Sequence, residues 1–219
     1  KERSVERAAK APPYSDFLRN KTTKLWATGM RADASLGDVS VMAFCLTEIA
    51  LTGSRGKLLR NMRYYSAETF DIEKLHRKPP RGAGESPVSL VCDTEGPSKI
   101  VLGWSPNSDG TAQKNGKHAV VKLNVPILPE ASHLLPLIKG SLTQLCQGLN
   151  DGDFVLRPKG KSSYGRDTLA TNFRKLFDCP IGDDTGSETG GLRKSIENRA
   201  RELYEKGEIT EEQHLMVHH

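Results

Sequence analysis

Two arginines in this sequence each follow a glycine-containing turn and open a segment with helical periodicity. Arg55 comes after Thr52-Gly53-Ser54, and Arg193 comes after Gly190-Gly191. The first turn of a helix carries backbone N–H groups without partners inside the helix and the positive end of the helix dipole, and both favour an anion. An arginine adds a planar fork that can hydrogen-bond two phosphate oxygens at once. The two arginines therefore predict a phosphate-binding site built from distant parts of the chain.

A third segment suited to chemistry is the polar stretch Asn107–Lys117, which we expect to connect the two strands of a β-hairpin. Its last four residues, Lys114-Asn115-Gly116-Lys117, have the composition of a tight turn. A lysine at the tip of such a hairpin can reach a bound backbone and donate a proton to a leaving oxygen. The competing interpretation, for these lysines and for the two arginines, is a solvated charge without a role.

These segments resemble motifs in the catalytic domain of the tyrosine recombinases, the phage-integrase-like enzymes that exchange DNA strands. Thr52–Tyr64 resembles the first arginine box of that family. Lys114–Lys117, followed by Val125-Pro126-Ile127, resembles the family's β-hairpin. Leu192-Arg193 resembles the second arginine box, and Leu215–His219 resembles the segment that follows it. All four motifs occur in the order that the family has.

The resemblance implies DNA strand cleavage and rejoining, as in site-specific recombination or integration, through a 3′-phosphotyrosine intermediate. Arg55 and Arg193 would hold the nonbridging oxygens of the scissile phosphate and stabilise the charge of the transition state. Lys114 would protonate the 5′-oxygen leaving group, and His218 would bond the phosphate or act as acid or base. No metal and no cofactor is implied. The implied catalytic residues are Arg55, Lys114, Arg193 and His218, with Lys117 and His219 as alternatives for the lysine and the histidine.

The resemblance also implies a nucleophilic tyrosine beyond the position of His218. The printed chain ends before it, so we expect these 219 residues to bind DNA without cleaving it. The sequence departs from the family pattern at Leu58, where an acid is usual, and at Gly190, where a histidine is usual. Both departures would permit an alternative, a non-catalytic DNA-binding module derived from a recombinase. A type IB topoisomerase-like or telomere-resolving enzyme, with the same phosphate clamp, is a further alternative.

Positive charge is unevenly distributed along the chain. The formal net charge of +5 favours a polyanionic partner, here double-stranded DNA. Basic residues are concentrated between Arg55 and Arg81, whereas Asp183–Glu212 is rich in acids. A loop tyrosine, Tyr164, has basic neighbours. The resemblance further implies self-association on DNA. We predict DNA contacts from Lys57, Arg60, Arg63, Lys161, Tyr164, Arg166 and Lys194.

The helices that must position these residues have recognisable boundaries. Ser35 and Asp38 form a capping-box pattern in front of a core helix that runs to Gly53, with an apolar repeat that begins at Leu36 and continues through Val39 to Ala50. A second helical piece is expected through about Tyr64. Tyr64 and Tyr65 would then be helical packing residues, and Tyr204 would face the core from a later helix. Further helical patterns cover Glu130–Leu149, Asp167–Phe177, Gly191–Lys206 and the residues from Thr210 onward. The Gly191–Lys206 pattern has an apolar face made of Leu192, Ile196, Ala200 and Leu203, and Thr-Glu-Glu-Gln at Thr210 is another capping box.

Between the helices lie three short segments rich in Val, Leu and Ile: Ser86–Asp93, Lys99–Ser105 and His118–Pro126. They predict a three-stranded antiparallel sheet. The order of helices, small sheet and helices gives the fold class α+β, mainly helical and tyrosine-recombinase-like. We expect residues 1–34 to form an N-terminal arm or the end of a preceding segment, and residues 35–219 to form the recombinase-like catalytic domain.

The composition limits the class of protein. With 36% hydrophobic and 27% charged residues, it is typical of a soluble globular protein. The sequence predicts neither a membrane span nor a signal peptide, because no apolar run is long enough. The four cysteines are widely spaced and have no zinc-site pattern, so buried thiols in a reducing compartment are expected. The expected location is the cytoplasm of a prokaryote or phage host, or a eukaryotic nucleus.

Overall fold

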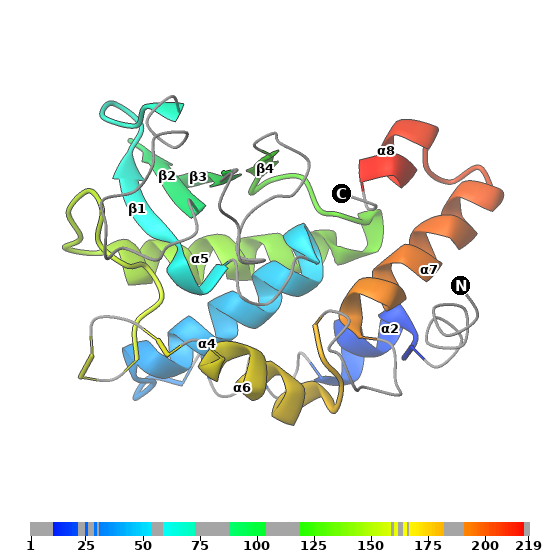
Figure 1. Cartoon of the computed structure of the whole chain (residues 1–219), viewed down its shortest axis with the longest axis horizontal. Helices are drawn as coiled ribbons and strands as arrows, with labels where there is room; N and C mark the ends of the chain where they lie inside the picture. Colours follow the sequence, from blue (N-terminus) through cyan, green and yellow to red (C-terminus); the bar gives the residue numbers. More distant parts are fainter. Residues whose placement is uncertain are drawn as a thin grey trace.

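A four-stranded sheet and a set of helices make up the described part of the chain (Figure 1). The structure is a computed structural model, and it describes residues 11–21, 25, 29, 31–53, 59–72, 88–103, 119–158, 160–161, 164–165, 167–181 and 191–216. Because helices precede and follow the strands instead of alternating with them, the fold class is α+β, as predicted.

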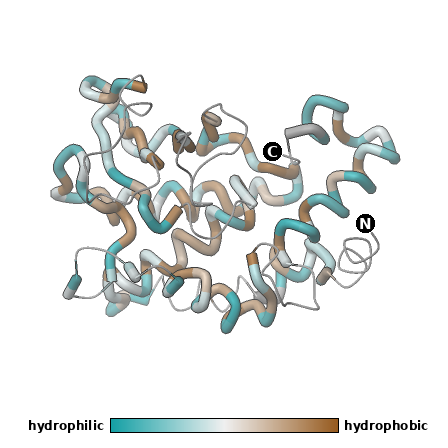
Figure 2. Tube along the Cα trace, in the orientation of Figure 1, coloured by the Kyte–Doolittle hydropathy of each residue, from teal (hydrophilic) through white to brown (hydrophobic). Residues whose placement is uncertain are grey.

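Helix α4, Leu36–Thr47, begins at the predicted capping box. The Ser35 hydroxyl accepts a hydrogen bond from the Asp38 N–H at 3.2 Å, and the Asp38 carboxylate accepts one from the Ser35 N–H at 3.0 Å. The helix continues into a π-helical turn, η2 (Glu48–Thr52), which ends at Gly53 in the left-handed region with φ of 49°. Figure 2 shows the hydrophobic residues concentrated along this helix. Leu36, expected on its buried face, is nevertheless 45% exposed.

The sheet differs from the prediction, because it has four strands and is mixed. Strands β2 (Val88–Asp93), β3 (Gly96–Leu102) and β4 (Ala119–Lys122) are antiparallel neighbours, as expected. The additional strand, β1 (Arg63–Ser66), runs parallel to β2 at the edge. Tyr64 and Tyr65 therefore lie in a strand, and the prediction of a helix there is wrong. Aromatic residues suit a half-buried pleated surface, and pairing with β2 decides the outcome against the local helical pattern.

The segment before Ser35 contributes to the same core as the residues after it. It contains a short helix, α2 (Tyr14–Asp16), and a π-helical turn, η1 (Phe17–Lys21). The fully buried ring of Phe17 lies 5.6 Å from that of Phe177 and 6.4 Å from that of Phe173, measured between centroids. The described part of the segment that we expected to be an arm is thus packed against helix α6 (Thr168–Phe177).

Helix α5, Leu135–Cys146, contacts both α4 and β3 and so lies between the sheet and the other helices (Figure 1). A 3-10 helix, η5 (Pro129–Leu134), leads directly into it. The single helix expected over Glu130–Leu149 is therefore divided. Pro136 in the first turn of α5 explains where the α-helix begins, because proline lacks an N–H and is tolerated there.

Helices α7 (Leu192–Glu205) and α8 (Glu211–Met216) follow in the last part of the chain. Leu192, Ile196, Ala200 and Leu203 are buried, which confirms the predicted apolar face of α7. The predicted capping box at Thr210 is also present, since its hydroxyl accepts from the Gln213 N–H and its N–H donates to the Gln213 side chain. Tyr204 does not face the core as expected. It is 41% exposed and stacks on His214 with 4.9 Å between ring centroids.

Candidate functional site

The Thr-Gly turn of the first predicted box is described as far as Gly53. Thr52 Oγ1 donates to the carboxylate of Glu48 at 2.8 Å, and the Gly53 N–H closes the π-helical turn on the Glu48 carbonyl at 2.8 Å. Glu48 is fully buried. Gly53 is required here because its φ of 49° is unfavourable for a residue with a Cβ. The turn therefore ends α4 and η2 at a fixed point.

Gly53 lies against helix α7, which carries the second predicted box. A Cβ added to Gly53 would be 2.7 Å from Ile196 Cδ1 and 3.7 Å from Ile127 Cδ1. Ile196 is 1% exposed and stands one helical turn after Arg193. Gly53 of the first predicted box thus packs against the Ile196 side chain of the helix that carries the second box, although the two are far apart in the sequence.

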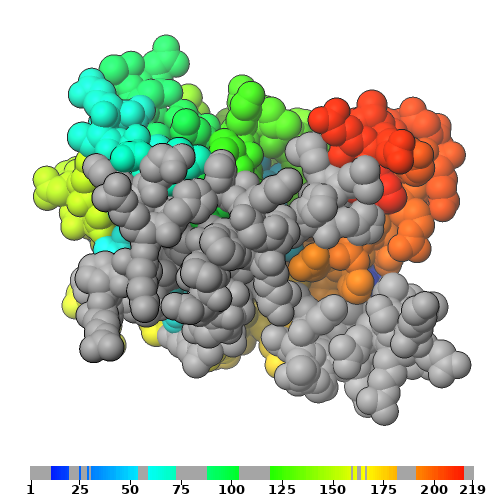
Figure 3. Space-filling model, turned by 45° about the horizontal axis from the view of Figure 1, so that its top comes forward, coloured from blue at the N-terminus to red at the C-terminus, as the bar shows by residue number. Residues whose placement is uncertain are grey.

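The segment after the predicted hairpin reaches the same place. Ile127, the last residue of the Val-Pro-Ile motif, donates its N–H to the Ala50 carbonyl of η2 at 2.7 Å. Strands β3 and β4 pair directly at Leu102 and Ala119, so the chain between them leaves and returns to the sheet at one position. The end of the first box, the Val-Pro-Ile segment and helix α7 are therefore neighbours at Gly53. Figure 3 shows the strands of the sheet at one end of the molecule and α7 with α8 at the other.

Arg193 lies in the first turn of α7, as predicted, but the backbone donors beside it are occupied. The Leu192 N–H donates to the Pro180 carbonyl and the Arg193 N–H to the Ile181 carbonyl, both at 2.9 Å. The expectation that this helix start offers free N–H groups to an anion is therefore wrong at these two positions. The preceding segment supplies the carbonyls that a phosphate would otherwise replace. Only the Arg193 side chain remains as a donor from this residue.

The Arg193 guanidinium is oriented by an acid one turn further along the helix. Its Nε donates to Glu197 Oε1 at 3.1 Å, while Lys194 Nζ donates to Glu197 Oε2 at 2.7 Å. The Arg193 side chain is 28% exposed, and its two terminal nitrogens have no partner among the residues that the structure describes. This arrangement fixes the guanidinium plane and leaves the fork available for a phosphate.

Glu197 is a residue of the candidate site that the sequence analysis missed. Burial raises the pKa of its carboxyl, but the hydrogen bonds and positive charges of Lys194 and Arg193 outweigh burial, and the pKa is lowered overall. The spacing of an acid four residues after an arginine on a predicted helix was a usable signal. Glu197 is a positioning residue, because its carboxylate orients the Arg193 guanidinium.

Replacing Glu197 with glutamine is expected to lower the free energy of unfolding by about 1.5 kcal/mol at pH 7, the scale of a charge-assisted hydrogen bond. Since the carboxyl pKa is below its ordinary value of 4.5 in the folded protein, its contribution is complete above that pH and is lost as the pH falls below it. Urea unfolding from pH 7 to pH 3 should therefore show the two proteins converging at low pH. A constant difference across this range would contradict the ion pairs.

The predicted DNA-contacting residues have different surroundings. Arg63 donates to the Gly152 carbonyl and lies over the Phe154 ring, with its Cζ 4.2 Å from the ring centroid. Lys194 is only 19% exposed in its pair with Glu197. Tyr164 is half-buried and donates its hydroxyl to the Gly37 carbonyl at 3.1 Å. These three side chains hold local structure, so contact with DNA stays a prediction for them.

Two other residues predicted to contact DNA have a side-chain nitrogen without a partner among the described residues. Lys161 is exposed and has no side-chain partner among the described residues. Arg60 follows Leu59 in a 3-10 turn, η3 (Leu59–Asn61), and its Nε is buried without a hydrogen-bond partner in the described part of the chain. The remaining predicted residues lie outside the described residues: Arg55, Lys57, Lys114, Lys117, Arg166, His218 and His219.

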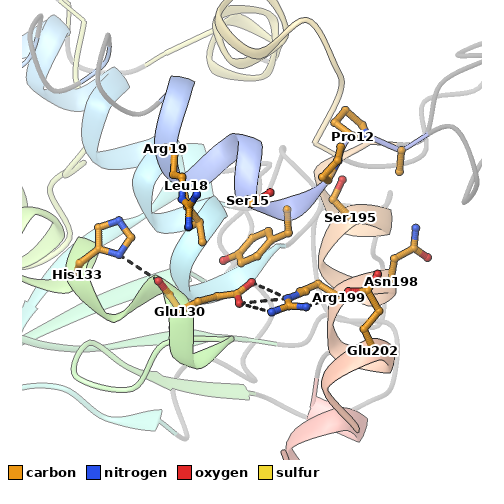
Figure 4. Close-up of a pocket in the computed structure, with 13 residues that line it drawn as sticks. Pro12, Ser15, Leu18, Arg19, Glu130, His133, Ser195, Asn198, Arg199 and Glu202 are labelled. Carbon is orange, nitrogen blue, oxygen red and sulfur yellow. Dashed lines mark hydrogen bonds and ion pairs between the residues drawn. The ribbon is translucent and has the colours of Figure 1, made fainter. Parts of the chain in front are cut away.

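A polar pocket of about 890 Å³ lies on another side of α7 (Figure 4). It is lined by the N-terminal segment, η5 and α7, and none of the described residues that line it is a predicted catalytic residue. Arg199 is bound there by both carboxylate oxygens of Glu130 and by Glu202 at 2.9 Å. These hydrogen bonds raise the pKa of Arg199. Because this guanidinium is already neutralised, the pocket is a weaker phosphate site than Arg193.

Comparison with known proteins identifies no relative. No model of a protein family matches the chain, and neither a curated protein nor a solved structure matches it. Among the described residues, no helix has the length and apolar character to cross a bilayer. The same residues contain no group of three or more His, Cys, Asp or Glu side chains that could hold a metal ion.

Proposed function

We propose that this chain is part of a DNA strand-cleaving and rejoining enzyme of the tyrosine-recombinase type. The observation that carries the proposal is the packing of Gly53 against Ile196 and Ile127, which brings three separate motif segments together. Nothing in the local sequence requires this contact.

Chain geometry limits how far apart the two arginines can be. Arg55 follows Gly53 by two residues, which span at most about 7 Å even when fully extended. Arg193 precedes Ile196 by three residues, a rise of about 4.5 Å along α7. Both arginine side chains are long enough to close the remaining gap around one phosphate. Gripped from two sides, such a phosphate gains most of its stabilisation when charge develops on its oxygens in the transition state.

The proposed reaction assigns the remaining roles as the family resemblance does. A tyrosine hydroxyl attacks the phosphorus, the 5′-oxygen leaves with a proton from Lys114 or Lys117, and His218 bonds the phosphate. Strands β3 and β4 pair with each other in the sheet. This pairing supports the proposed role of a lysine on the segment that connects them. Attack of the freed 5′-hydroxyl on the phosphotyrosine then rejoins a strand and releases the tyrosine.

A second candidate function is DNA binding without cleavage. The observation that favours it is the occupation of the α7 N–H groups by the carbonyls of Pro180 and Ile181. An active site that relied on these donors would be weakened, whereas a binding surface needs only positive charge. The two candidates agree on duplex DNA as the partner and differ in whether a covalent adduct forms.

Duplex binding by residues 1–219 should be tested first, by fluorescence anisotropy across a range of salt concentrations. The logarithm of the binding constant is expected to fall linearly with the logarithm of salt, with a slope of about −0.9 per phosphate neutralised. Lys161 is exposed, and we expect it to contact a phosphate. Lys161→Ala should therefore weaken binding to all sequences alike and reduce the slope by about 1.

Lys206→Ala is the matched control, since Lys206 is equally exposed but lies at the end of α7 in the acid-rich segment. It should bind as the unaltered chain does. Binding that is absent, or that does not respond to salt, would contradict both candidate functions.

A further inference from the structure

Two cysteines that are 54 positions apart in the sequence lie side by side in the fold. The Sγ atoms of Cys92 and Cys146 are 3.9 Å apart, within hydrogen-bonding distance for sulfur. Cys92 is in β2, next to the parallel strand β1, and Cys146 is the last residue of α5. Both thiols are free. To form an S–S bond of about 2.05 Å, the two sulfurs would have to move closer together by about 1.9 Å, which rotation of the two side chains can supply.

The surroundings of the pair favour oxidation of these two cysteines over the other two. Cys146 is partly exposed and lies against the buried Cys92, whereas Cys45 and Cys179 are both buried. The hydrogen bond with Cys146 lowers the pKa of the Cys92 thiol in spite of burial. Burial raises the pKa of Cys45. A thiolate with a second thiol in contact is the arrangement that forms a disulfide after oxidation.

We infer that Cys92 and Cys146 form a site of reversible oxidation, at which hydrogen peroxide converts the two thiols into a disulfide between β2 and α5. This inference is independent of the proposed function. It rests on the distance between the sulfurs and on the access to Cys146 from solvent.

The reaction balances with peroxide as the only oxidant. The Cys92 thiolate attacks one peroxide oxygen, so an S–O bond forms while the O–O bond breaks, and the departing hydroxide takes the thiol proton as water. The Cys146 thiol then attacks the sulfenic sulfur, the S–O bond breaks, and a second water leaves. Two thiols and one peroxide give one disulfide and two waters. A thiol reductant such as glutathione reverses the product.

The disulfide would join the sheet to α5 and close a long loop in the unfolded chain. Because the disulfide would constrain the unfolded chain, we expect it to raise the midpoint of thermal unfolding by about 5–15 °C for a loop of this length in a protein of this size. Since α5 also contacts α4, the same link would restrict movement between the sheet and the helices around Gly53.

The test is to treat the full chain with equimolar hydrogen peroxide, block remaining thiols, and identify cross-linked peptides by mass spectrometry. A peptide pair containing Cys92 and Cys146, lost after reduction, is expected together with the higher unfolding midpoint. Cys146→Ser should abolish the cross-link and the rise, and Cys92→Ala should do the same if it folds. Cys179→Ala is the control and should leave both unchanged.

Two results would overturn the inference. One is the recovery of Cys92 and Cys146 as separately blocked thiols after peroxide has oxidised a free-thiol standard to completion. The other is a cross-link that joins different cysteines or different molecules. Both results can be obtained with the unaltered chain, so they do not depend on the folding of any variant.

Discussion

Replacing Arg193 with alanine is expected to lower the rate of DNA strand cleavage by about 10² or more, by analogy with the loss of one oxyanion-stabilising donor. The Arg193 side chain presents its terminal nitrogens from the start of α7, where Glu197 holds its Nε. Removing it deletes a fork that would bind two phosphate oxygens, and the effect would be largest when charge builds on those oxygens. The measurement is the rate of covalent protein–DNA adduct formation on a nicked duplex, made with a full-length protein, meaning a chain that extends beyond His219 and includes the expected tyrosine.

Two further variants distinguish the paired hydrogen bonds of the Arg193 guanidinium from the effect of its positive charge alone. Arg193→Lys keeps the positive charge but cannot make two parallel hydrogen bonds, so it should recover only part of the lost rate. Arg201→Ala removes an exposed arginine from the same helix and should cleave at the original rate. Cleavage by Arg193→Ala at the original rate would exclude Arg193 from the site. Duplex binding without adduct formation by the unaltered full-length protein would favour the non-catalytic candidate.

Features encoded within a few neighbouring residues could be predicted from the sequence. The Ser35–Asp38 capping box, the Gly53 stop and the apolar face of α7 each depend on residues within one or two turns, and all are confirmed. Glu197 belongs to the same class, because its position four residues after Arg193 is a local signal that the sequence analysis did not use.

Features decided by distant partners could not be predicted in the same way. Tyr64 and Tyr65 follow a helical pattern, but their pairing with β2 is a non-local contact that only the folded chain reveals. Tyr204 lies at the edge of the helical stripe, and the stacked His214 ring, contributed by α8, favours its exposed position. The donors at the start of α7 are satisfied by the carbonyls of Pro180 and Ile181, which no spacing rule indicates.

The contact that carries the proposed function is also non-local, and it can be measured as a coupling between two substitutions. Gly53→Ala is expected to lower the free energy of unfolding by about 3 kcal/mol. Of this, about 1–2 kcal/mol comes from a Cβ in the left-handed region. The remainder comes from overpacking, because the new Cβ would lie 2.7 Å from Ile196 Cδ1.

Two matched variants divide this cost into its parts. Gly148→Ala places a Cβ at φ of 70° with no atom within 4 Å, so it should show the backbone cost alone. Ile196→Val deletes the Cδ1 atom and costs about 1 kcal/mol by itself. The double variant Gly53→Ala, Ile196→Val should then be more stable than the sum of the single losses predicts, by about 1–2 kcal/mol, since the overpacking is relieved.

Urea unfolding followed by circular dichroism gives all four free energies. If the two substitutions are additive, Gly53 and Ile196 do not touch, and the two arginine boxes lose the contact that supports a shared phosphate site. If they are coupled as expected, adduct formation should follow the same pattern. Gly53→Ala would then slow it more than Gly148→Ala does, and Ile196→Val would restore part of the rate, because the position of Arg55 relative to Arg193 depends on how closely the two segments pack.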